Sequence, residues 1–132
     1  MAGTEKRRRT HKLPPQIALA VSAAEDKKAV DMAVLDLRKA GGFTDYFVIC
    51  SGQNAPQIRA IADSITDALG SEGARPSHVE GYYRSEWILL DYFDFVVHIF
   101  ATETRIFYGL EGLWGAAERV NFDAQEPRPS RP

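Results

Sequence analysis

The chain has 132 residues, a net charge of −2 and 45% hydrophobic residues, which is the size and composition of one globular domain with tails. No apolar run approaches the ~20 residues that a membrane span needs, so we expect a cytoplasmic protein. The single cysteine, Cys50, excludes an internal disulfide and a cysteine-rich zinc site. It lies in an apolar run, where a buried structural thiol is favoured.

Both ends of the chain have the composition of disordered tails. Residues 1–13 contain a block of basic residues, namely Lys6, Arg7, Arg8, Arg9, His11 and Lys12. Such a block either solubilises the chain or contacts nucleic acid. Residues 121–132 are rich in proline and arginine. Residues 14–120 then form a single domain, which is more acidic than the whole chain and suited to a basic protein partner.

The first half of this domain predicts a helix, two strands and a second helix. The first helix runs from about Pro15 to Lys28, since proline suits a helix start. Ala29–Leu37 and Thr44–Ser51 are predicted to be neighbouring strands, the second covered on both faces. Asn54 is a plausible cap for the next helix, which ends at Gly70 or Gly73. Its apolar residues recur at helical spacing: Ile58, Ile61, Ala62, Ile65 and Leu69.

The second half predicts strands and a last helix. Val79–Tyr83, Trp87–Tyr92 and Phe95–Ala101 read as strands, the last two forming a hairpin. Thr102 is a plausible cap for a helix with one apolar face, formed by Phe107, Leu110, Trp114 and Ala117. This order predicts an α/β fold: a single layered domain with a mixed β-sheet flanked by helices.

Evidence for catalysis is weak. Ser51-Gly52 lies between a strand and a helix, where backbone amides could hold a phosphate, but a plain turn is favoured. Asp91 and Asp94 are the only suggestive acidic pair, and aspartates beside a tight turn commonly bond to the backbone. The three histidines, His11, His78 and His98, have no zinc-ligand spacing. We therefore expect no enzyme activity, no metal and no cofactor.

Aromatic residues are dense between Tyr82 and Trp114, and Trp87 among them is equally compatible with a core and an interface. Alternation along a strand places Trp87, Leu89 and Asp91 on one face, and Ile88, Leu90 and Tyr92 on the other. A face that combines tryptophan with a carboxylate is unusual for a core. Tryptophan and tyrosine beside charged groups are typical anchors of protein interfaces.

Three blocks of this sequence resemble the ribosomal silencing factor (Iojap/RsfS) family. They are TDYFVICSG at 44–52, WILLDYFDFVVHIF at 87–100 and RIFYGLEGLW at 105–114, with Glu80-Gly81 before the second. The resemblance covers about Ala20 to Ala117. The chain departs from the pattern at Phe93, where a turn glycine or polar residue is common, and both tails lie outside it.

The resemblance implies a nucleotidyltransferase-like fold without the catalytic carboxylates. It also implies a translation repressor that binds a basic intersubunit-face protein of the large ribosomal subunit, number fourteen in the usual naming, and blocks subunit association under nutrient limitation. Members of the family often form homodimers. The alternative is a degenerate or active nucleotidyltransferase that binds nucleotide and Mg²⁺ through Ser51-Gly52, Asp91 and Asp94.

We predict a partner-binding site with Trp87 as anchor. Asp91 and Tyr92 are expected beside it, Asp94 and Glu80 form its charged rim, and His98 and Tyr108 are further candidates. A ribosomal RNA contact through the basic tail is left open. The complementary charges suit a basic partner.

Overall fold

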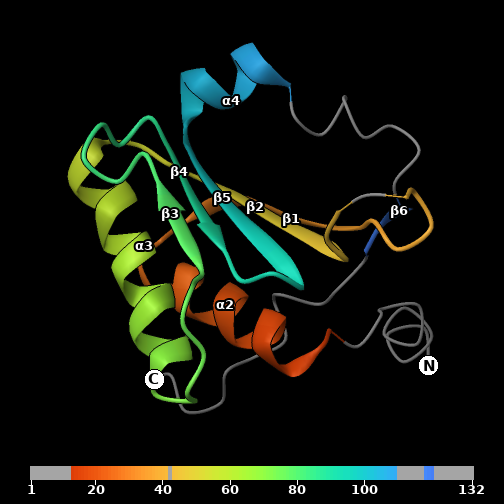
Figure 1. The fold of residues 1–132 in the computed structure, drawn as a ribbon. Coiled ribbons are helices and arrows are strands. Elements are labelled where there is room, and N and C mark those ends of the chain that lie inside the picture. The colour runs from red at the N-terminus through yellow and green to blue at the C-terminus, as the bar shows by residue number, and fades with distance from the viewer. Residues whose placement is uncertain (1–12, 42, 110–117, 121–132) are drawn as a thin grey trace, which may run out of the picture.

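The computed structural model describes residues 13–41, 43–109 and 118–120. Its elements are, in chain order, α2 (Pro15–Asp26), β1 (Val30–Asp36), β2 (Tyr46–Gly52), α3 (Ala55–Gly70), β3 (His78–Glu80), β4 (Trp87–Asp91), β5 (Phe95–Ala101), α4 (Thr102–Tyr108) and β6 (Glu118–Arg119). They form one sheet with helices against it (Figure 1), which confirms the predicted α/β architecture. No helix in these described ranges is long and apolar enough to cross a membrane.

The sheet is mixed, with the strand order β3-β4-β5-β2-β1-β6. Its central strands β2 and β5 are parallel, and all other neighbouring strands are antiparallel. The two most continuous apolar runs of the sequence occupy these central strands, where nearly every side chain is buried. Such runs are typical of strands that are covered on both faces. The strand register also confirms the predicted pairing of β1 with β2 and the β4–β5 hairpin.

Helix α3 is the best-specified element. Asn54 Oδ1 accepts a hydrogen bond from the Gln57 amide at 2.8 Å, and Gln57 Oε1 accepts one from the Gln53 amide at 2.7 Å. The first bond satisfies an amide that the first helical turn leaves without a partner, and the second ties the residue before the cap to the helix. The helix ends at Gly70, so its predicted cap and end are confirmed.

Most of the apolar core lies between the sheet and one helical layer. Helices α2 and α3 pack together against one face of the sheet (Figure 1). Ile17, Val21, Ile61 and Ile65 are buried there, together with the inward residues of β4, Ile88 and Leu90. A second, smaller cluster on the opposite face contains Phe47, Ile49 and Phe100, with Trp87 and Leu89 packed against it.

Three predictions about element bounds need correction. The strand predicted over Val79–Tyr83 is His78–Glu80, because Gly81 has a φ of +77° and turns the chain. A Cβ at Gly81 would lie 2.2 Å from the Trp87 carbonyl oxygen, so only glycine fits. Thr102 is the first helical residue of α4, and Ala101 holds the cap position without a capping side chain.

The last helix ends earlier than its apolar spacing predicted. Gly109 adopts the left-handed conformation at its C-cap, with a φ of 56°. The predicted face residues Leu110, Trp114 and Ala117 lie outside the described residues, and so do both predicted tails apart from Leu13. The two-residue strand β6 was not predicted, and it pairs with β1 at Leu35 and Asp36.

Candidate partner-binding surface

The register of the strands brings the predicted site residues of three strands to one face. Glu80 pairs with Leu89, and Leu89 pairs with His98. Trp87 pairs with Phe100 one row away. Directly paired residues point to the same side of a sheet, so Glu80, Trp87, Leu89, Asp91 and His98 share the face opposite α2 and α3. We call this set the Trp87 face.

Trp87 is half-buried and bonded within the chain. Its Nε1–H donates to His98 Nδ1 at 3.0 Å, and its ring centroid lies 4.9 Å from that of Phe100. The Phe47 ring packs edge-on against His98 with centroids 4.5 Å apart. Because the indole N–H is already used, Trp87 offers a partner the apolar surface of its ring and no hydrogen bond from this donor.

His98 is held as a neutral imidazole. It is 4% exposed, and burial lowers its pKa to about 4. Because Nδ1 accepts from Trp87, the proton must sit on Nε2. That Nε2 is buried and has no hydrogen-bond partner among the described residues. His98 therefore belongs to the framework that positions Trp87, and it is not accessible enough to be a general base.

Two carboxylates accompany the aromatic cluster. Glu80 is exposed on the edge strand β3, where His78 Nε2 contacts its carboxylate. Asp91 is half-buried, and its Oδ1 accepts from the Phe93 amide at 2.8 Å. This bond supports a turn in which Phe93 has a φ of 76°, a strained conformation for a residue with a side chain. The predicted local role of Asp91 in its turn is confirmed.

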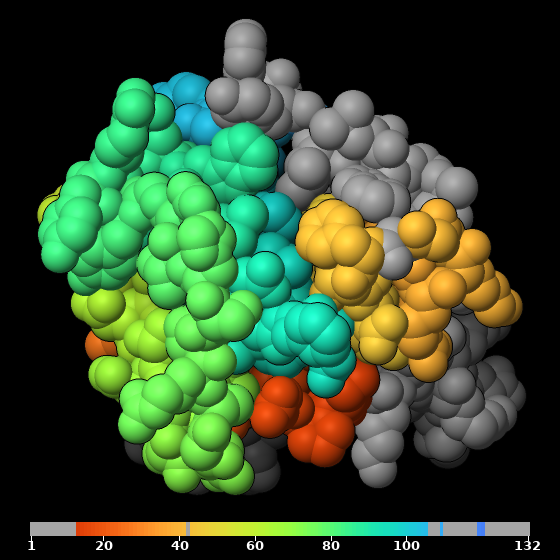
Figure 2. Space-filling view, in the orientation of Figure 1, coloured from red at the N-terminus to blue at the C-terminus, as the bar shows by residue number. Residues whose placement is uncertain are grey.

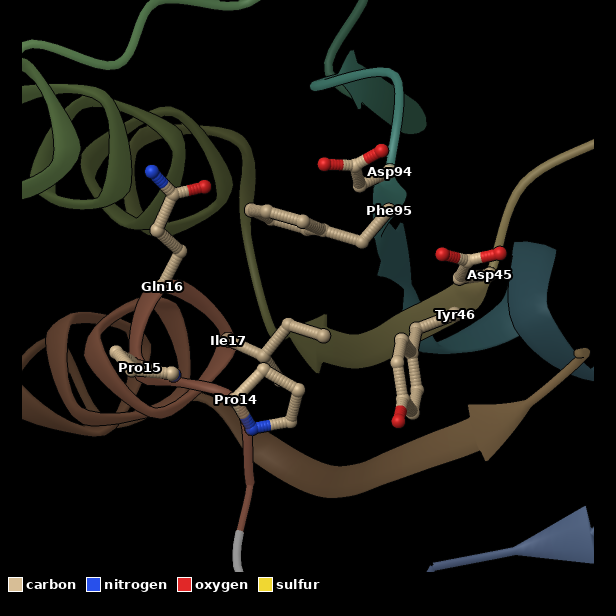
Figure 3. A pocket seen from close by; sticks show the side chains of 8 residues that line it. All are labelled: Pro14, Pro15, Gln16, Ile17, Asp45, Tyr46, Asp94 and Phe95. Carbon is tan, nitrogen blue, oxygen red and sulfur yellow. The ribbon is translucent and has the colours of Figure 1, made fainter.

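Two predicted site residues, Tyr92 and Asp94, are not on this face, and a third, Tyr108, cannot be placed on it. Tyr92 was expected beside Trp87, but it alternates to the opposite side and lies in the main core, 9% exposed. Burial raises the pKa of Tyr92 to about 12. Asp94 lines a cleft at the start of α2 instead (Figure 3). Tyr108 is the last residue of α4, and its side chain lies outside the described part of the chain.

The strand–helix junction at Ser51-Gly52 is filled by the chain itself. Ser51 is fully buried, and its Oγ accepts from Arg105 Nη1 at 3.0 Å. A Cβ at Gly52 would lie 2.7 Å from Ile58 Cγ1. Ser51 and Gly52 are thus the last residues of β2, and not the turn that the sequence favoured. With the Gln57 amide capped by Asn54 and Gly52 packed against Ile58, the junction does not form the cradle that a phosphate needs.

The described residues form no cluster suited to binding a metal ion, and their one cysteine is not placed to act as a nucleophile. Nowhere in them do three or more His, Cys, Asp or Glu side chains gather as a metal site would require. Asp91 faces the Trp87 side and Asp94 faces the cleft, so the two do not converge. Cys50 is fully buried, and burial raises its pKa to about 12, which confirms the prediction of a structural thiol.

The sequence predicted only part of the Trp87 face. The alternation of β4 signalled Leu89, which was placed with Trp87 but not chosen as a site residue. Phe47 and Phe100, which pack against His98 and Trp87, gave no signal. Both faces of the central strands are apolar, so periodicity cannot separate them. Figure 2 shows the β4–β5 region, in cyan, between the green atoms of the α3–β3 region and the orange atoms of the β1–β2 region.

Comparisons with known proteins agree with this fold. A family model described as "Ribosomal silencing factor during starvation" matches residues 10–132, beyond the 20–117 region of the motifs. The chain is 37% identical over 107 residues to the ribosomal silencing factor RsfS of Bacillus subtilis, which covers 81% of this chain and 91% of that protein. A crystal structure from Bacillus halodurans is 36% identical with a TM-score of 0.72, covering 80% of this chain and 96% of that one. One from Chromobacterium violaceum is 29% identical with a TM-score of 0.76, covering 90% and 98%.

Proposed function

The chain belongs to the ribosomal silencing factor family, and from this premise we propose that it represses translation by binding the large ribosomal subunit and blocking subunit association. The family consists of non-enzymatic ribosome-binding factors, so the prediction that the chain is not an enzyme is confirmed. Repression under nutrient limitation, as the family description suggests, is part of the proposal.

The observation that carries the proposal is the Trp87 face. It combines a half-buried tryptophan, the half-buried Leu89 and two carboxylates on one side of the sheet. Protein interfaces use such apolar anchors inside a polar rim. The carboxylates of Glu80 and Asp91 suit a basic partner, for which we propose the intersubunit-face protein number fourteen of the large subunit.

The mechanism requires no chemistry. A bound protein of this size would occupy part of the surface on which the small subunit docks, and an interface of standard size buries roughly 1,600 Å² in total. In this proposal the fixed strands β4 and β5 present Trp87 in a defined position, because the His98 bond and the Phe100 ring hold its side chain. A contact surface built on strands loses little conformational freedom on binding.

Co-sedimentation with isolated ribosomal subunits tests the proposal. The chain should pellet with the large subunit and not with the small one, and it should lower the fraction of subunits that associate when both are mixed. Pelleting with neither subunit, or unchanged association at saturating protein, would reject it. A cytoplasmic location, expected from the sequence, and a homodimer, expected from the family resemblance, are also proposals, and sedimentation equilibrium tests the second.

A further inference from the structure

A second feature of the surface lies on the helical side of the sheet, away from the Trp87 face. It is a cleft of about 500 Å³ where the start of α2 meets the starts of β2 and β5 (Figure 3). One wall is Pro14, Pro15, Gln16 and Ile17, and the other consists of Asp45, Tyr46, Asp94 and Phe95. An apolar floor thus carries two carboxylates on one side.

The backbone holds these two carboxylates in place. The Asp45 amide donates to the Asp94 carbonyl oxygen at 2.9 Å, and Thr44 Oγ1 donates to the Phe93 carbonyl oxygen at 2.8 Å. These bonds tie the segment before β2 to the turn before β5. Asp45 and Asp94 are themselves exposed, and within the described residues neither carboxylate makes a hydrogen bond or an ion pair.

A nearby cation does not neutralise the cleft. Arg38 lies over the Tyr46 ring, 5.3 Å from its centroid. Its guanidinium is committed to Asp36, with Nε to Oδ1 at 3.0 Å and Nη2 to Oδ2 at 2.7 Å. The start of α2 contributes only about half a positive charge from its dipole, against two full negative charges. The cleft is therefore negative overall.

We infer that this cleft binds the chain's own basic run, Lys6–Lys12, through its lysine and arginine side chains. The described chain begins at Leu13, and the next residue, Pro14, is already part of the cleft wall. At about 3.6 Å per extended residue, Lys12 lies within roughly 7 Å of Pro14 and Lys6 within roughly 29 Å. Every cation of the run can therefore reach Asp45 or Asp94.

Because the basic run is attached to the chain beside the cleft, it binds there more readily than the same peptide would when free. A short linker gives an attached ligand an effective concentration in the millimolar range, so even weak surface ion pairs become populated. Arginine suits the site best, because its planar guanidinium can form two parallel hydrogen bonds with a carboxylate. Basic side chains held in the cleft would be shielded from nucleic acid, so the contact would weaken binding of the run to RNA.

Paramagnetic relaxation in the full-length chain tests this contact. A nitroxide placed at Thr4→Cys labels the run alone, because the native Cys50 is fully buried. The amides of Asp45, Tyr46 and Phe95 should broaden at low salt and recover at high salt. The broadening should fall at least twofold in the Asp45→Asn/Asp94→Asn variant. A matched variant, Asp67→Asn/Glu86→Gln, removes two exposed charges outside the cleft and should keep it.

Equal broadening in both double variants would overturn the inference. The contact would then depend on the net charge of the chain and not on the two carboxylates of the cleft. Absence of broadening at these amides in the parent chain would overturn it as well. The same spectra report whether each variant is folded. Affinity for a short poly-U RNA should rise more for Asp45→Asn/Asp94→Asn than for the matched variant. An equal rise would show that the cleft does not shield the basic run from RNA.

Discussion

Trp87 and His98 are joined by a hydrogen bond from the indole Nε1–H to the imidazole Nδ1 at 3.0 Å, which fixes the proton of His98 on Nε2. The two residues lie on neighbouring strands, in adjacent rows of the same sheet face. A tryptophan with its N–H satisfied inside the protein can present an apolar ring to a partner without a desolvation cost for this donor. The bond therefore links the stability of the sheet to the shape of the Trp87 face.

A double-mutant cycle should detect this bond. Trp87→Phe removes the donor and His98→Leu removes the acceptor, and each should lower the free energy of unfolding by about 1–3 kcal/mol. If the bond contributes directly, the two losses will be less than additive by about 1 kcal/mol. Urea denaturation of the four proteins gives the coupling, and strictly additive losses would show that the two side chains act independently.

Stability should decrease in acid because of His98. Burial places its pKa at about 4 in the folded chain, against an ordinary value of 6.5. Below pH 6.5 the unfolded chain takes up a proton that the folded chain accepts only near pH 4, so stability present above pH 6.5 is lost across this window. The loss amounts to about 3 kcal/mol. Urea midpoints measured at several pH values should decline less steeply in acid for His98→Gln than for the parent chain. Parallel declines would show that His98 does not cause the loss of stability.

Reversing one charge on the Trp87 face should weaken ribosome binding. Glu80→Lys places a cation where we propose a basic partner, so affinity for the large subunit should fall at least tenfold at low salt, and less at high salt. Glu72→Lys makes the same charge change at an exposed position outside the Trp87 face and serves as the control. Equal affinities of the two folded variants would exclude Glu80 from the interface.

Gly52 should be intolerant of a side chain. A Cβ there would lie 2.7 Å from Ile58 Cγ1, and Ile58 is almost completely buried. Gly52→Ala should therefore cost about 1–3 kcal/mol through overpacking. At Gly70 a Cβ would meet nothing within 4 Å, so Gly70→Ala should leave stability unchanged or raise it by up to about 1 kcal/mol. Thermal unfolding of both variants provides the comparison.

The sequence by itself determined the elements whose signals are local. Helical spacing and the Asn54 cap specified α3, and alternation correctly divided β4 into a face with Trp87 and a face with Ile88. Continuous apolar runs marked the two central strands. The family could be inferred from three motif blocks, because each block is a short contiguous stretch.

Only the tertiary structure decided which of these residues meet. Strand register, which depends on contacts between distant segments, placed Glu80, Leu89 and His98 in one row and brought Asp94 to Asp45 beside the start of α2. Alternation had already put Tyr92 on the side of Ile88 and Leu90, and the packing of α2 and α3 made that side the main core. Two residues are too few to show a periodic pattern, so the sequence did not signal β6. It is a strand because it pairs with β1. Local periodicity states which way a side chain points along its own strand, but its neighbours are set by packing across the sheet.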